Sequence, residues 1–94
     1  MMSGCSPWHY ANVTSQVFQA LQAKGRQQGF AIPKSPSGGF TVQTAGMKIH
    51  FRYAWNKSSS SLQLECINKP QLLSCSMIKS FADRIVTQCG GRPL

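Results

Sequence analysis

Acidic residues are scarce in this sequence: Glu65 and Asp83 are its only carboxylate side chains. General acid–base catalysis uses paired titratable groups in a cleft, and we expect these two residues to lie on different elements. Cys75 is the one candidate nucleophile, since it falls in the first turn of a predicted helix, where the helix dipole favours a thiolate. The sequence pattern places no histidine where it could activate this thiol. We therefore predict a protein without enzymatic activity and without catalytic residues.

Long apolar runs and metal-ligand spacings are missing too. No stretch of the chain is long and apolar enough to span a membrane, and the opening residues lack the basic and apolar regions of a secretory signal. The cysteines show no CxxC spacing typical of zinc sites; they are Cys5, Cys66, Cys75 and Cys89. We predict a cytoplasmic protein with free thiols and with neither a metal nor a cofactor.

Basic residues are abundant by contrast. Ten Lys and Arg give the chain a formal net charge of +8. They are spread along the sequence without a consecutive run, unlike a nuclear-localisation or polybasic-tail signal. Such an excess attracts anionic partners, but it also keeps a small protein soluble. Both interpretations stay open at the level of the sequence.

The chain length and its periodic segments predict one domain over residues 1–94, with a helix near each end. The first helix is predicted over about 7–24, because Ser6 and Pro7 suit a helix start and apolar residues recur at helical spacing. Gly25 or Gly29 is expected to end it. The second is predicted over about 75–89, after Ser74 or Ser76 as N-cap and before the glycines at 90 and 91.

Three strands are predicted between these helices, over about 39–45, 47–55 and 62–68, from alternation of apolar and polar residues. A tight turn at Ala45-Gly46 would join the first two strands, and Gly46 supplies the positive φ such turns need. Pairing every apolar residue on one face then fixes the register. The expected pairs are Val42–Ile49, Phe40–Phe51, Trp55–Leu62, Tyr53–Leu64, Phe51–Cys66 and, on the opposite face, Arg52–Glu65.

The predicted fold is therefore α+β: an α-β-β-β-α two-layer sandwich in which two helices pack on one face of a three-stranded antiparallel meander. This order is similar to that of the double-stranded-RNA-binding domain, over about Tyr10 to Cys89, and the similarity implies recognition of duplex shape. That family carries a lysine cluster at the start of its second helix. Here the matching segment is Ser74-Cys75-Ser76-Met77-Ile78-Lys79, with only Lys79 agreeing in kind.

The open face of the predicted sheet carries the candidate ligand-binding residues. Lys48, His50 and Arg52 alternate along the middle strand, and Lys57 lies in the following hairpin turn. They are the candidate contacts for an anionic partner such as RNA or DNA. We nevertheless favour a protein–protein interaction or self-assembly module, because the predicted sheet leaves a face with Ile67 open and exposes an edge strand. Binding of an anionic partner is the alternative.

Overall fold

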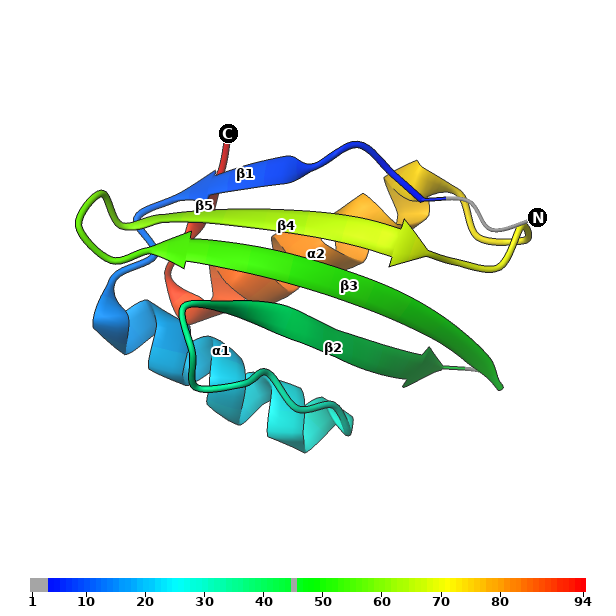
Figure 1. The fold of residues 1–94 in the computed structure, drawn as a ribbon, viewed down its shortest axis with the longest axis horizontal. Coiled ribbons are helices and arrows are strands. Elements are labelled where there is room, and N and C mark those ends of the chain that lie inside the picture. Colours follow the sequence, from blue (N-terminus) through cyan, green and yellow to red (C-terminus); the bar gives the residue numbers. More distant parts are fainter. Residues whose placement is uncertain (1–3, 45) are drawn as a thin grey trace.

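The computed structural model describes residues 4–44 and 46–94, which form two helices and a five-stranded antiparallel sheet (Figure 1). The elements in chain order are β1 (Trp8–Ala11), α1 (Ser15–Gln28), β2 (Ser37–Thr44), β3 (Met47–Asn56), β4 (Ser61–Asn68), α2 (Cys75–Cys89) and β5 (Arg92–Pro93). The strand order across the sheet is β2-β3-β4-β1-β5. The α+β class is thus as predicted.

The predicted three-stranded meander is only part of the observed sheet. It exists as β2–β3–β4, but β1 adds to the free side of β4 and β5 adds to β1. Tyr10 of β1 pairs with Leu62 of β4, and Ala11 pairs with Arg92 of β5. Pro93 is tolerated in β5 because an edge strand needs no ladder bond on its outer side. The chain therefore also departs from the α-β-β-β-α order on which the resemblance to the RNA-binding domain depended.

The first helix begins later than predicted, at Ser15 rather than near residue 7, and extends to Gln28. The segment before it is strand β1, whose Trp8 and Tyr10 face the core. Asn12 adopts a positive φ of 60° and turns the chain out of β1. Thr14 is the true N-cap, since its Oγ1 accepts a hydrogen bond of 3.3 Å from the Val17 N–H.

The two central hairpins have the predicted registers. All five apolar pairs and the Arg52–Glu65 pair are those expected from one buried face. Thr44 pairs with Met47, and Gly46 has φ 76°. Ala45, the other predicted turn residue, lies outside the described residues.

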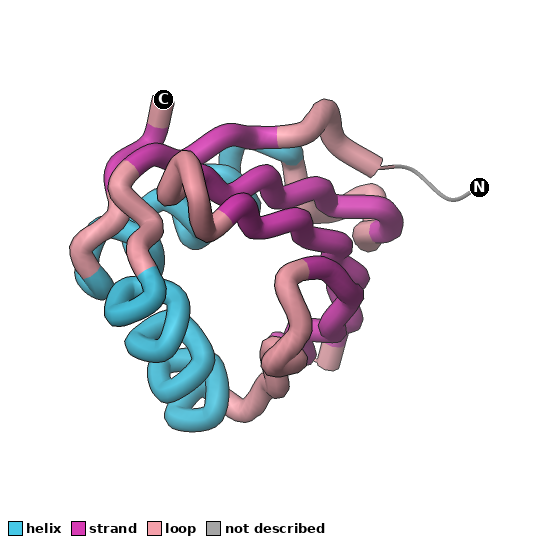
Figure 2. Tube along the Cα trace, turned by 60° about the vertical axis from the view of Figure 1, so that its left-hand side comes forward, coloured by secondary structure: helices cyan, strands magenta, loops and turns pink. Residues whose placement is uncertain are grey.

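The second helix spans Cys75–Cys89, as predicted, with Ser74 as N-cap and Gly90 at φ 108° as C-cap. Gly29, at φ 92°, ends α1 in the same left-handed way. Both helices pack on one face of the sheet (Figure 2). The core between the two layers includes Tyr10, Val13, Phe18, Leu21, Val42, Ile49, Phe51, Tyr53, Leu62, Leu64, Cys66, Ile78, Ala82, Ile85 and Val86.

Aromatic contacts fasten α1 to the sheet. The Phe18 ring stacks on Trp55 with centroids 4.3 Å apart and planes 6° apart, and it contacts Tyr53 at 5.8 Å. The indole Nε1 of Trp55 donates to the Val13 carbonyl at 2.7 Å, just before the helix. The aromatic cluster and this hydrogen bond thus help to hold the N-terminal half of α1 against the sheet.

The prediction that the cysteines are free thiols is wrong for two of the four. Cys5 and Cys75 form a disulfide, whereas Cys66 and Cys89 are free. The bond ties the segment before β1 to the first turn of α2. Cys5 is also held by its backbone, because its N–H donates to the Cys66 carbonyl at 2.8 Å. The cytoplasmic location, predicted from the lack of a secretory signal, stays a prediction, and the disulfide does not favour it, since stable disulfides belong mostly to oxidising compartments.

Tyr10 links β1 to α2 inside the core. Its side chain is fully buried, and its hydroxyl donates to Asp83 Oδ1 at 2.8 Å. Burial first, and then the hydrogen bond and negative charge of Asp83, raise the pKa of Tyr10 far above its ordinary value. Asp83 also accepts from Lys79 at 2.8 Å, the i,i+4 pair expected from the sequence.

We expect Tyr10 to make the protein sensitive to alkali. An unfolded tyrosine loses its proton above about pH 10, whereas buried Tyr10 keeps it, so the unfolded state is favoured as pH rises from about 10 toward the higher pKa of the folded state. This residue then reduces the free energy of unfolding by about 1.4 kcal/mol per pH unit above pH 10. Denaturant unfolding above pH 10 should show that the free energy of unfolding falls less steeply with pH in Tyr10→Phe than in wild type. A difference that stays constant with pH would contradict the expectation.

Candidate functional site

The four candidate anion-binding residues do not form a cluster. Lys48, His50 and Arg52 point to the outer face of β3, as predicted, and Lys57 lies in the turn after it. Lys48 and Lys57 are nine positions apart along an extended strand, which corresponds to roughly 30 Å. The structure therefore confirms the shared face for the strand residues and does not bring Lys57 next to Lys48.

Two of these four side chains already have partners. Arg52 forms a salt bridge with Glu65 at 2.7 Å, and His50 Nδ1 lies 2.9 Å from Thr41 Oγ1. The two acids of the chain are thus both paired, Glu65 with Arg52 and Asp83 with Lys79. Within the described part of the chain, the basic residues that form no salt bridge are distributed over the sheet, both helices and the loops: Lys24, Arg26, Lys34, Lys48, Lys57, Lys69, Arg84 and Arg92.

Aromatic side chains of the strands face the helices. Phe40, Phe51, Tyr53 and Trp55 belong to the inner set of residues, as do Trp8 and Tyr10 of β1. Single-stranded nucleic acids are commonly bound by stacking their bases on exposed aromatic rings. The outer face of the described strands carries no Phe, Tyr or Trp ring, and its aromatic groups are the imidazoles of His9 and His50.

The edge strand β2 has an uncovered row of backbone groups. The Trp55 N–H donates to the Pro36 carbonyl at 2.7 Å, which places the even-numbered residues of β2 in the hydrogen-bonded positions toward β3. The odd-numbered residues therefore direct their N–H and C=O groups away from the sheet. Those of Gly39, Thr41 and Gln43 meet no hydrogen-bond partner within the described part of the chain.

The two edges of the sheet differ in protection. β5 is two residues long and consists of an arginine and a proline, both of which discourage strand addition. β2 is eight residues long and carries no charged residue and no proline. The sequence indicates an exposed edge but not which strand provides it, because β1 and β5 cover one side of the predicted meander. The unprotected edge is therefore β2.

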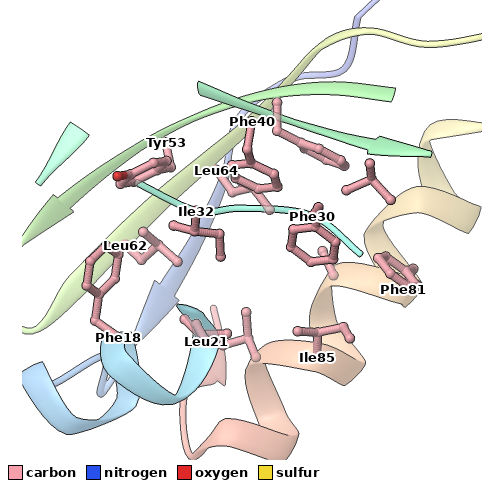
Figure 3. A pocket seen from close by; sticks show the side chains of 14 residues that line it. Phe18, Leu21, Phe30, Ile32, Phe40, Tyr53, Leu62, Leu64, Phe81 and Ile85 are labelled. Atoms are coloured by element: carbon pink, nitrogen blue, oxygen red, sulfur yellow. The ribbon is translucent and has the colours of Figure 1, made fainter. Parts of the chain in front are cut away.

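An apolar cleft lies between α1, α2 and the inner face of the sheet (Figure 3). Its open volume is about 50 Å³, and its walls present no polar surface. All five phenylalanines of the chain line it. The full lining is Phe18, Leu21, Phe30, Ile32, Phe40, Val42, Phe51, Tyr53, Leu62, Leu64, Phe81, Ala82, Ile85 and Val86.

A second hollow of about 210 Å³ adjoins this cleft and shares Val42 and Phe81 with it. We call it the entrance groove. Its lining is Gln28, Val42, Gln43, Ile49, Leu73, Met77, Ile78 and Phe81. Helical periodicity assigns Phe81 and Ile78 to the core but cannot show that packing between α1 and α2 is incomplete, so neither hollow could be predicted from the sequence.

The cysteines offer little chemistry. Cys75, the predicted nucleophile candidate, is bound in the disulfide. Burial raises the pKa of the Cys66 thiol, which contacts the Asn68 carbonyl at 3.7 Å, and burial also raises the pKa of Cys89. Both free thiols are therefore held in their protonated, less reactive form near neutral pH.

Comparisons with known proteins give no further guidance, since no protein-family model, curated protein or solved structure matches the chain. Among the described residues, no group of three or more His, Cys, Asp or Glu is arranged to hold a metal ion. Neither α1 nor α2, the helices that the structure describes, has the length and apolar character needed to cross a membrane. The function must therefore be argued from the surfaces themselves.

Proposed function

We propose that this protein is a self-assembly module in which the β2 edges of two copies pair to form one continuous sheet. The observation that carries the proposal is the uncovered, uncharged edge at Gly39, Thr41 and Gln43. A long edge strand without charge, proline or a covering element readily accepts another strand. Main-chain hydrogen bonds then supply affinity without any special side-chain chemistry.

Charge favours a second copy meeting the molecule at this edge. Each chain carries a net charge of +8, so most pairs of surfaces from two copies would repel each other. β2 itself carries no charge, and of the two basic residues that lie opposite it on β3, Arg52 is neutralised by Glu65 and Lys48 keeps its charge. Two copies can therefore approach along β2 with little local repulsion once salt screens the rest of the surface.

The side chains of β2 suit a two-fold antiparallel pairing. When Thr41 lies opposite Thr41 of the second copy, Gly39 meets Gln43 on the outer face. Phe40 then lies opposite Val42 of the second copy on the inner face. Phe40 is half-buried in the single chain and already contacts Phe30 and Phe51 at 5.4 and 5.2 Å. Cross-strand pairing would extend this apolar layer from one copy into the next.

We expect Thr41→Pro to abolish dimerisation while leaving the fold intact. The Thr41 N–H points away from β3, so proline removes no backbone hydrogen bond of the present sheet, but it removes the donor that a second copy needs. The side-chain contact of Thr41 with His50 is lost in both Thr41→Pro and Thr41→Val, so it does not distinguish them. Each dimer would lose this bond twice, and the ring would also obstruct the approach. The dissociation constant should rise at least about tenfold. Sedimentation equilibrium at micromolar concentrations measures it, with circular dichroism checking the fold.

Thr41→Val is the matched control, because it keeps the N–H and the β-branched shape and should still dimerise. A wild-type protein that stays monomeric throughout the concentration range would overturn the proposal. A monomer retained on duplex RNA or DNA, with retention falling steeply as salt rises, would point instead to the alternative of an anionic partner. Equal dimerisation of wild type and Thr41→Pro would place the interface elsewhere and equally reject the β2 edge.

A further inference from the structure

We infer that one end of the molecule docks onto an anionic lipid surface, with Leu72 entering the outer layer of the bilayer and lysines contacting the headgroups. This end comprises Ile67 in β4, Leu72 in the β4–α2 loop and Met77 in α2, with Lys48 and Lys69 beside them. We call it the lysine–leucine end. It lies outside β2, so the inference goes beyond self-assembly and does not depend on it.

Strand pairing and helix packing bring these segments together. Asn68 pairs with His50, which puts the following Lys69 near the start of β3, where Lys48 lies. Met77 lines the entrance groove together with residues of β2 and β3, so the first turn of α2 reaches the same part of the sheet. The end of β2, the start of β3 and the β4–α2 connection accordingly lie at one end of the long axis (Figure 1).

Exposed apolar side chains are concentrated at this end. Among the described residues, the large apolar side chains left exposed are Leu72 (86%), Leu94 (75%), Met77 (57%) and Ile67 (43%). Three of these four belong to the lysine–leucine end, whereas Leu94 lies away from it (Figure 1). Single exposed apolar residues are ordinary on a protein surface, but a group of them in one place marks an interaction site.

The charges at this end select an anionic partner. Both acids of the chain are already paired, one with Arg52 and the other with Lys79. Lys48 and Lys69 form no salt bridge within the part of the chain that the structure describes. A second copy carries the same net charge of +8 and would be repelled here. An anionic surface would instead neutralise both lysines.

The residue types favour lipid over nucleic acid. Leu72 gains nothing from phosphate groups, but burying it among acyl chains is favourable. It lies in a turn closed by the Leu73 N–H, which donates to the Pro70 carbonyl at 3.2 Å, and it lines neither the cleft nor the entrance groove. Lysine is a flexible point charge that suits a diffuse layer of headgroups, whereas arginine suits paired contacts with single phosphates. A protruding leucine beside two lysines therefore matches a bilayer surface.

Co-sedimentation of the full chain with lipid vesicles tests the inference. Vesicles of phosphatidylcholine containing about a third phosphatidylglycerol supply the anionic surface, and vesicles of phosphatidylcholine alone are the neutral counterpart. We expect binding to the anionic vesicles and binding at least about tenfold weaker to the neutral ones, since each lysine near such a surface contributes about fivefold.

Leu72→Ser tests the insertion of the leucine. It should weaken binding to the anionic vesicles about tenfold, as expected for removing one buried leucine side chain. Leu94→Ser is the matched control, because it removes an equally exposed leucine outside the lysine–leucine end and should leave binding unchanged. Both side chains are exposed, so neither change disturbs the core, and circular dichroism checks the fold.

Lysine variants test where the charge acts. Lys69→Gln and Lys48→Gln should each weaken binding to the anionic vesicles about fivefold. Lys57→Gln lowers the net charge equally from the β3–β4 turn, at the other end of β3, and should weaken it less than about twofold. The same substitutions in the Thr41→Pro background should have the same effects, which separates this surface from self-assembly.

Failure to bind the anionic vesicles would overturn the inference, and so would equal binding to both kinds of vesicle. Equal losses in Leu72→Ser and Leu94→Ser, or in Lys69→Gln and Lys57→Gln, would show that no particular end of the molecule is used. Retention on duplex RNA that Leu72→Ser leaves unchanged, without vesicle binding, would assign the lysines to nucleic acid instead. Dimerisation of the wild type can fail or succeed without altering these comparisons.

Discussion

Replacing both Cys5 and Cys75 by serine should lower the free energy of unfolding by about 4 kcal/mol. The disulfide joins residues 70 positions apart, so it closes most of the chain into a loop. Restricting so long a loop removes much of the conformational entropy of the unfolded chain, and the chain-entropy account gives a value of this size. Small domains are stable by only about 5–15 kcal/mol, so the loss would be a large fraction of the total.

Denaturant unfolding with and without a dithiol reductant measures the effect. Reduced wild type and the double serine variant should agree within error, since both lack the same covalent link. Cys89→Ser is the control, because Cys89 is free and only partly buried, and it should unfold like wild type under both conditions. A wild-type protein whose unfolding is insensitive to the reductant, despite complete reduction, would contradict a stabilising role of the disulfide.

Phe18→Ala should lower the free energy of unfolding by about 3–5 kcal/mol. Phe18 is 4% exposed and is the aromatic residue by which α1 contacts the sheet, through Trp55 and Tyr53. Truncation to alanine removes buried apolar area, loses the stacked pair and enlarges a region beside the cleft that is already incompletely packed. The cost is therefore expected near the upper part of the range for core phenylalanines.

The neighbouring residue supplies the control for this variant. Gln19 is exposed on α1, so Gln19→Ala should change stability by no more than about 0.5 kcal/mol. Thermal and denaturant unfolding measure the stability of both variants relative to wild type. A loss below about 1 kcal/mol for Phe18→Ala would show that α1 moves toward the sheet and fills the space, which would contradict the expected cost of an unfilled cavity.

Much of the central fold follows from local sequence pattern. The registers of β2, β3 and β4 are determined by alternation over eight to ten residues, because a one-residue slip would turn every apolar side chain to solvent. The bounds of α2 follow from Ser74, Gly90 and the apolar stripe between them. The outward direction of Lys48, His50 and Arg52 follows from the same alternation.

The candidate sites could be predicted from the sequence less completely than the fold. That Lys57 lies far from Lys48, and that Arg52 pairs with Glu65, are consequences of strand length and register. The unprotected β2 edge appears only when β1 and β5 are known to cover the other side. The cleft depends on how far α1 stands from α2, and hydrophobic periodicity does not report that distance.

The scarcity of acids, the +8 charge and the strong periodic segments were determined by the sequence itself, because each is a property of neighbouring residues or of composition. Only the tertiary structure decided that Trp8–Ala11 and Arg92–Pro93 are strands and that Cys5 bonds to Cys75. Segments of four and two residues are too short to show a period. Their conformation is stabilised by partners remote in the chain, such as Leu62 for Tyr10 and Ala11 for Arg92, and such contacts exist only after the chain has folded.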